Sequence, residues 1–222
     1  MSDNHQRAQK KIMWIGVFGI TMGYFEAAVV EYLRVHYYPE GFGFPLKMLP
    51  DKMLTIELGR EAASILMLIS AGVLAGRNFM DRFAGFMFGF GTWDITYYCW
   101  LKLFDNWPAS LFTDDLLFLI PLPWVGPVWA PIGVSIGLIW AAIVYWLMLD
   151  EGRSIRLRAW EWAGEALSGL TIILSFLWNA PKVLGNQPPG KYPWMLWMAG
   201  MCLGLVLFLR AKRRASRMME DT

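Results

Sequence analysis

The stretch TIELGREAASILMLISAGVLA, residues 55–75, decides the class of this protein. It is apolar over most of its length and reaches the ~20 residues that a helix needs to cross a bilayer. Near its start stand Glu57, Arg60 and Glu61, and their spacing of i, i+3 and i+4 places all three side chains on one face of a helix. The stretch therefore predicts a membrane-spanning helix with a charged patch close to one end.

Five more apolar runs of similar length lie along the chain. It has 222 residues, of which 56% are hydrophobic, and repeated long apolar runs are typical of an integral membrane protein. We expect an all-α, polytopic membrane bundle of about six transmembrane helices, forming one domain over residues 1–222, with the bundle at 12–209 between tails at 1–11 and 210–222. The expected spans are Met13–Leu33, Leu54–Ala75, Phe83–Leu101, Trp124–Leu149, Trp162–Ala180 and Tyr192–Leu209.

The distribution of lysine and arginine predicts the orientation. Six spans leave both termini on one side, and the side richer in these residues is cytoplasmic. Thirteen lie on the side of the termini: Arg7, Lys10, Lys11, Arg77, Arg82, Arg153, Arg156, Arg158, Arg210, Lys212, Arg213, Arg214 and Arg217. Six lie on the other: Arg34, Lys47, Lys52, Lys102, Lys182 and Lys191. We therefore expect both tails to be cytoplasmic.

The basic segment RAKRRASR, residues 210–217, has the composition of an anchor for anionic lipid headgroups. No folded nucleic-acid-binding module accompanies it, so we expect membrane lipids as partners and no nucleic acid.

The segment DNWPASLFTDDLLFLIPLPWVGPVWAP, residues 105–131, is proline-rich. Proline removes a backbone donor and interrupts helices, and irregular backbone at membrane depth is tolerated only where protein or water satisfies it. We expect a short re-entrant or interfacial segment before helix four, with an ordinary proline-capped helix start as the alternative. A second irregular segment, residues 37–53, is expected to lie on the outer membrane face.

Acidic side chains gather at the outer ends of the first three expected helices. Five carboxylates face one arginine there, and burying charge in hydrocarbon is costly, so either some carboxylates are protonated or a cation completes the site. The candidate metal ligands are Glu26, Glu57, Glu61 and Asp94, and the other candidate polar residues are Arg60, Tyr97, Tyr98, Glu31 and His36.

Within this site we expect Glu61 and Asp94 to form the coordinating or titrating pair. We expect Arg60 to adjust the pKa of both carboxyl groups and Tyr97 to donate a hydrogen bond. A purely structural interpretation has Glu57 capping its helix and Arg60 paired with Asp94.

Histidine content limits the cofactors. His5 and His36 are the two histidines of the chain, which disfavours a bis-histidine haem. A metal would be a divalent ion held by carboxylate oxygens. The sequence carries no phosphate-binding loop or nucleophile motif, so it predicts no catalytic residue.

At GYFEAAVVEYLR, ELGREAASILML, TWDITYYCWLKL and LLFLIPLPWVGPVWAP, the chain resembles a group of bacterial multipass membrane proteins to which no activity is attached; the likeness covers roughly residues 15–135. The resemblance implies a helical bundle in the bacterial inner membrane. It implies no activity, cofactor or catalytic residue.

Three functions are open at this point. The leading hypothesis is an outward-facing acidic site that binds a cation or exchanges protons, as in a small transporter. The second is a metal-dependent enzyme acting on a lipid or isoprenoid at the outer face, beneath a lid formed by residues 37–53. The third is an accessory subunit of a larger respiratory or photosynthetic membrane complex. A homo-oligomer is a further possible assembly.

Overall fold

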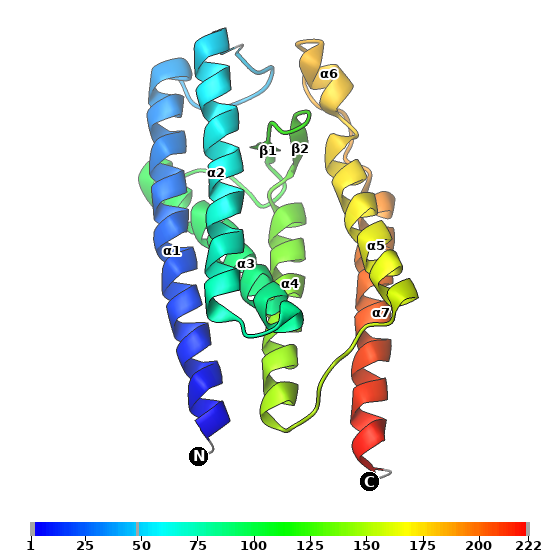
Figure 1. Ribbon diagram of the computed structural model, residues 1–222. Helices are drawn as coiled ribbons and strands as arrows, with labels where there is room; N and C mark the ends of the chain where they lie inside the picture. Colours follow the sequence, from blue (N-terminus) through cyan, green and yellow to red (C-terminus); the bar gives the residue numbers. More distant parts are fainter. Residues whose placement is uncertain (1–2, 48, 221–222) are drawn as a thin grey trace.

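The structure is a computed structural model that describes residues 3–47 and 49–220. It is mostly helical, with one small sheet (Figure 1). The start of α1 and the end of α7 lie at one end of the bundle, the terminal end, and the two strands lie toward the opposite end, the hairpin end. The elements in chain order are α1 (Asp3–Tyr37), α2 (Asp51–Ala75), α3 (Phe79–Asp105), β1 (Asp114–Phe118), β2 (Trp124–Pro127), α4 (Trp129–Asp150), α5 (Ala159–Leu177), α6 (Ala180–Leu184) and α7 (Trp194–Glu220).

Long apolar helices make up most of the described chain. Large apolar side chains are exposed on them, among them Trp14, Phe25, Leu74 and Met195, as on a surface that contacts lipid. These helices are compatible with a multipass integral membrane protein. Five segments of the described residues are long and apolar enough to cross a membrane: Gln9–Tyr37, Asp51–Ala75, Trp129–Asp150, Ala159–Leu184 and Trp194–Arg217.

The helix α3 is long as well, but it is not among these five segments. It packs against α1, α2 and α4, and its buried residues run from Asp81 to Leu101. A helix surrounded by protein can carry polar and small residues that a lipid-facing helix cannot. Because α3 is packed between the other helices, its buried face can carry Asp81 and Asp94.

Small residues let α1 and α3 approach closely. A Cβ atom at Gly23 would lie 2.3 Å from Oγ1 of Thr96, and one at Gly19 would lie 2.8 Å from Cβ of Thr92. Only glycine fits at such distances, and this small-residue spacing is a recurrent device for packing membrane helices. The contact fixes the charged end of α1 against α3.

The proline-rich segment forms strands that the sequence did not predict, and its re-entrant or interfacial position stays a prediction. Residues 114–127 form a two-stranded antiparallel hairpin, so the chain is not purely α-helical, and α4 begins at Trp129 instead of 124. Asp115 lies opposite Gly126 and Leu116 opposite Val125. Strand pairing satisfies backbone groups that a helix broken by proline would leave open, and Pro121 and Pro123 fall in the connection, where no ladder donor is needed.

Both expected tails continue as helix where the structure describes them. Residues 3–11 form the first turns of α1, and α7 continues through residues 210–220. His5 and Arg7 have side chains outside the described part of the chain.

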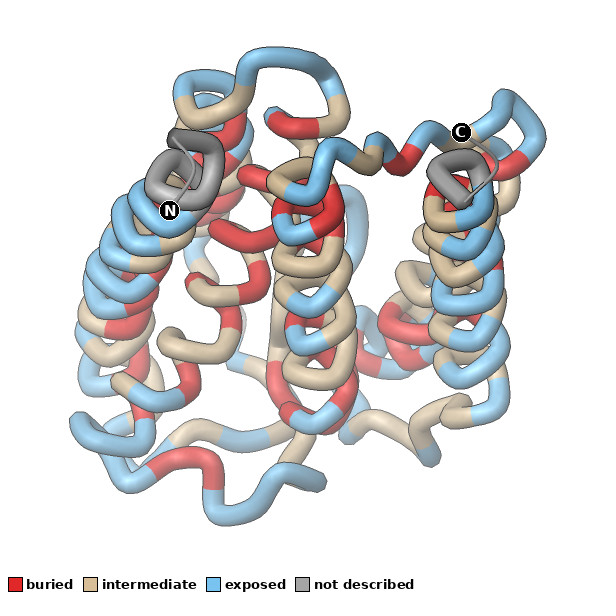
Figure 2. The backbone as a smooth tube through the Cα atoms, turned by 90° about the horizontal axis from the view of Figure 1, so that it is seen from below, coloured by how far each residue is buried: buried red, intermediate tan, exposed pale blue. Residues whose placement is uncertain are grey.

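The helices form two groups. The first contains α1 to α4, and the second contains α5 packed against α7; seen along the bundle, α5 and α7 lie at one side (Figure 2). Side chains of α4 and α7 meet between the groups, where the rings of Trp140 and Phe208 have centroids 5.4 Å apart. The hairpin connects the groups, because Trp124 stacks on Phe176 of α5 with ring centroids 6.1 Å apart. Gly126 lies against Tyr192, where a Cβ atom would be 2.8 Å from the ring.

Two buried carboxylates brace the terminal end. Asp81 accepts hydrogen bonds from Lys11 at 2.7 and 2.5 Å and from the indole of Trp146 at 2.9 Å, which ties α3 to α1 and α4. Glu161 accepts from both terminal nitrogens of Arg214 at 2.6 and 2.7 Å, which ties α5 to α7. Each helix group therefore has its own fully paired anchor.

Candidate functional site

A cavity of about 1540 Å³ lies between the two helix groups. Residues of the hairpin, of residues 38–49 and of all the helices line it. Most of its wall is apolar or aromatic, and the charged residues gather at the hairpin end, apart from Glu165 on α5. Ligand pockets in proteins typically measure ~300–1,000 Å³ and combine apolar walls with a few polar groups. This cavity is larger and has the same composition.

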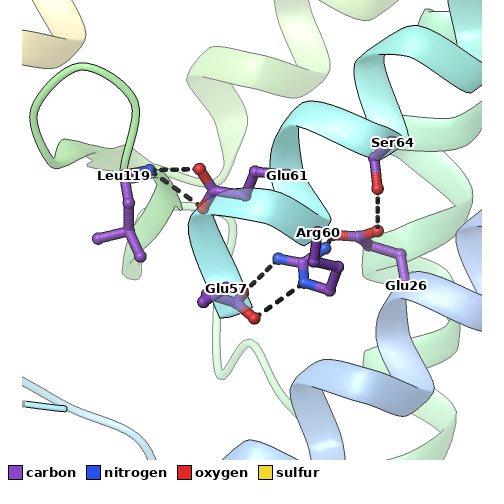
Figure 3. A network of polar contacts seen from close by, with 6 residues as sticks. All are labelled: Glu26, Glu57, Arg60, Glu61, Ser64 and Leu119. Atoms are coloured by element: carbon purple, nitrogen blue, oxygen red, sulfur yellow. Dashed lines mark hydrogen bonds and ion pairs between the residues drawn. The ribbon is translucent and has the colours of Figure 1, made fainter. Parts of the chain in front are cut away.

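Arg60 organises the first polar group at the hairpin end (Figure 3). Its Nε atom donates to Glu57 at 2.9 Å, and its two terminal nitrogens form ion pairs with Glu57 and with Glu26 of α1. The other oxygen of Glu26 accepts from Ser64 at 3.1 Å. The spacing of residues 57, 60 and 64 on one helical face predicts that these side chains share a side of α2. One guanidinium therefore pairs with two carboxylates from two helices, so this group has one more carboxylate than cations.

Glu61 has a different partner. Its two carboxylate oxygens accept the backbone N–H of Leu119, at 3.0 and 2.9 Å, in the connection between β1 and β2 (Figure 3). The side chain is 5% exposed. Because a backbone donor held against a carboxylate favours the ionised form, this contact offsets part of the cost of burying the carboxyl group, and it fixes the hairpin to α2.

Asp94 lies deeper in the bundle and accepts a hydrogen bond from Ser135 of α4 at 2.7 Å. The sequence offers Arg60 as its partner, but Arg60 is engaged with Glu26 and Glu57. The hydrogen bond expected from Tyr97 stays a prediction; its neighbour Tyr98 donates its hydroxyl to a different carboxylate, that of Asp115, at 3.1 Å. Glu61 and Asp94 therefore accept from different donors, and their action as a pair stays a prediction.

Arg34 and Asp115 form a polar pair that the sequence did not place in the site. Asp115 is 1% exposed and Arg34 is 5% exposed, and one terminal nitrogen of Arg34 lies 3.5 Å from the Asp115 carboxylate. The guanidinium is stacked between aromatic rings, 3.9 Å from the centroid of Trp107 and 4.5 Å from that of Phe42. Burial raises the pKa of Asp115 to about 6, although Arg34 and the Tyr98 hydroxyl favour its ionised form.

Seven of the nine candidate residues line the cavity: Glu26, Glu57, Arg60, Glu61, Asp94, Tyr97 and Tyr98. Glu31 and His36 are not among its lining residues. His36 is exposed at the end of α1 and packs edge-on against Tyr37. Four candidate carboxylates of the first three helices thus meet one cavity, together with Arg34, Lys47 and Asp115.

A metal ion needs several ligand atoms that converge on one point. Within residues 3–47 and 49–220, no three His, Cys, Asp or Glu side chains come together as a metal site. Glu26 and Glu57 converge on Arg60, while Glu61 and Asp94 face different donors. Metal binding by these four residues stays a prediction, and it would require new side-chain positions.

Comparison with protein-family models, with curated proteins and with solved structures finds no match to this chain.

Proposed function

We propose that this chain is a bacterial inner-membrane protein that binds a lipid-like amphiphile in the cavity between its two helix groups. In this proposal α3 is the sixth span, both termini are cytoplasmic, and the hairpin end faces outward. The observation that carries the proposal is the cavity itself, whose wall is apolar over most of its length and charged mainly at one end. An amphiphile has the same division into apolar body and polar head.

The dimensions of the cavity favour a long apolar chain. Its lining residues on α4 run from Pro131 to Tyr145, a helical distance of about 21 Å at 1.5 Å per residue. The hydrocarbon core of a bilayer is ~30 Å thick, about 15 Å for each leaflet, so a chain lying along α4 would extend through one leaflet and into the other. Phe176, Ile172 and Gly169 of α5 face it from the other helix group.

The polar head would lie beneath residues 38–49. Phe42, Leu46, Lys47 and Leu49 of this segment line the cavity, above the charged residues of α1 and α2. Under the expected orientation this end belongs to the outer leaflet. The proposed ligand thus belongs to the same class, a lipid or isoprenoid, as the substrate in the enzyme hypothesis. Residues of the segment that follows α1 would cover its polar head.

Two glycines provide a matched test. A Cβ atom at Gly169 or at Gly59 would have no atom within 4 Å, but only Gly169 lines the cavity. Native mass spectrometry of the full chain, purified in mild detergent from a bacterial membrane, measures the lipid retained per protein. We expect retained lipid in the wild type and in Gly59→Trp, and its loss in Gly169→Trp. Equal retention by all three proteins would overturn the proposal.

A second candidate function is proton or cation exchange, and the charge balance of the cavity supports it. Five carboxylates line the hairpin end and three basic residues face them: Glu26, Glu57, Glu61, Asp94 and Asp115 against Arg34, Lys47 and Arg60. Proton uptake or a bound cation would balance the difference. In proteoliposomes with a pH-sensitive dye inside, Glu61→Gln with Asp94→Asn should abolish proton flux, while Glu31→Gln should not. Unchanged flux in the double variant would remove this candidate.

A further inference from the structure

Arg34 is a buried cation whose donors are only partly used. The Nε and Nη1 atoms are buried and have no hydrogen-bond partner, while Nη2 faces Asp115 at 3.5 Å, which is long for a charge-assisted hydrogen bond. Buried donors are nearly always paired, and leaving one unpaired is costly. A guanidinium with two free donors in a cavity wall is therefore a site for an acceptor that the chain itself does not supply.

The chemistry of the donors selects the class of acceptor. A guanidinium presents its N–H groups in a planar fork that matches phosphate or carboxylate oxygens. Arg34 lines the cavity on α1, close to the end of that helix, so its partner would sit at the hairpin end of any molecule bound there.

The segment 38–49 covers this position. Phe42 stacks on the Arg34 guanidinium, and Lys47 is held in the same segment because its backbone N–H donates to the Tyr38 hydroxyl at 2.7 Å. The Lys47 side chain is exposed and also lines the cavity. Displacement of Phe42 would open Arg34 to a headgroup and leave Lys47 beside it.

Most of the carboxylates near this position have donors other than Arg34. Glu26 and Glu57 both pair with Arg60, Glu61 accepts from the Leu119 N–H, and Asp94 lies deeper and accepts from Ser135. Asp115 is the carboxylate that competes directly for Arg34. Because burial raises the pKa of Asp115 to about 6, a second anion at Arg34 would be accommodated by protonating Asp115.

We infer that Arg34 binds the anionic phosphate headgroup of the amphiphile, with Lys47 as a second cation above it. This inference rests on the proposed function, because the cavity must hold the apolar chain. The inference adds the chemical class of the headgroup, a phosphate, and the residue that binds it, Arg34. Free inorganic phosphate offers the same chemistry without the chain, so the experiment has to separate the two sources.

Three probes make that separation with the full chain in neutral detergent: 1-oleoyl-glycerol-3-phosphate, 1-oleoylglycerol and inorganic phosphate. Their dissociation constants are measured by tryptophan fluorescence. We expect the phosphate-bearing lipid to bind at least about tenfold more tightly than 1-oleoylglycerol. Arg34→Gln should reduce its affinity to that of 1-oleoylglycerol. Lys52→Gln, which removes an exposed positive charge near the start of α2 outside the cavity wall, should have no effect.

The other outcomes distinguish the inference from the proposed function. Equal binding of both lipids, weakened by Gly169→Trp, would overturn the headgroup inference and leave the lipid cavity intact. Inorganic phosphate binding as tightly as the phosphate-bearing lipid would overturn the amphiphile. Absence of binding by either lipid would overturn the proposed function itself. Retained binding of 1-oleoylglycerol by Arg34→Gln shows that this variant is folded. Arg34→Lys, which keeps the charge without the fork, should bind the phosphate-bearing lipid with intermediate affinity.

Discussion

Glu61 on α2 and Leu119 in the hairpin connection are joined by a contact in which both carboxylate oxygens accept one backbone N–H, at 3.0 and 2.9 Å. The two residues are 58 positions apart in the chain. The contact links the first helix group to the hairpin, and Trp124 links the hairpin to α5. The position of the cavity's hairpin end therefore depends on Glu61.

Replacing Glu61 by alanine should loosen the hairpin. The Leu119 donor would lose its partner, at a cost of about 1–3 kcal/mol. Hydrogen exchange should accelerate in peptides that contain residues 116–123, and it should stay unchanged in peptides from α7. Glu31→Ala, on α1 and outside the cavity wall, is the control. Equal exchange in both variants would show that Glu61 does not hold the hairpin.

Removing Arg60 should destabilise the bundle more than removing either of its partners. Arg60→Gln leaves Glu26 and Glu57 buried beside each other without their cation, and breaking a buried ion pair in this way costs about 3–5 kcal/mol. Thermal unfolding in detergent measures the loss. Adding Glu26→Gln should recover part of it, because one unpaired charge is then absent. Additive losses in the double variant would contradict a shared network.

Long apolar helices could be predicted from the sequence because their signal is local. Glu57, Arg60 and Ser64 share a face through helical spacing alone, and their meeting with Glu26 requires only that α1 and α2 be neighbours. The hairpin was not predicted: DDLLFLIPLPWVGP shows neither alternating polarity nor a two-residue glycine turn. Its folding back depends on Glu61 and Phe176, which are distant in sequence.

The pairing of Arg34 with Asp115 could not be predicted either, because it too depends on residues that are distant in sequence. Asp115 lies in the segment whose hairpin was not predicted, and only the hairpin brings it against Arg34 and Tyr98. Asp81 and Glu161 were also missed as anchors. Their signal was present in the basic residues Lys11 and Arg214, which an orientation argument had counted only as charges on the cytoplasmic side.

Asp115 should give the stability of the protein a specific pH dependence. Its pKa is raised from 3.8 to about 6 by burial, so between these values the folded state binds more protons than the unfolded state. Stability from this group is therefore full below pH 4 and is lost as the pH rises through 6, by up to about 3 kcal/mol.

The measurement is the difference in melting temperature between wild type and Asp115→Asn from pH 4 to pH 8. Taking the difference removes the contribution of the other titrating groups. Relative to the variant, the wild type should lose stability up to pH 6 and change little above it. A difference that is constant with pH, or that grows in favour of the wild type, would contradict a raised pKa.

The terminal-end anchor should affect stability without affecting ligand binding. Trp146→Phe removes the indole donor to Asp81, and a hydrogen bond to a charged group contributes about 1.5–3 kcal/mol. Thermal unfolding should show this loss, while the affinity for 1-oleoyl-glycerol-3-phosphate should equal that of the wild type. A loss of affinity without a loss of stability would show that this anchor belongs to the ligand site.

Photo-crosslinking with a lipid that carries a diazirine in its acyl chain tests the lipid-filled cavity most directly. After illumination of the full chain in bilayers, peptide mapping locates the attached lipid. Labelling is predicted at cavity-lining positions on facing helices, Gly137 and Ala141 of α4 and Ile172 of α5, and it should fall in Gly169→Trp but not in Gly59→Trp. Labelling confined to outward-facing residues such as Leu66 and Leu74, both exposed on α2, would contradict the cavity as a lipid site.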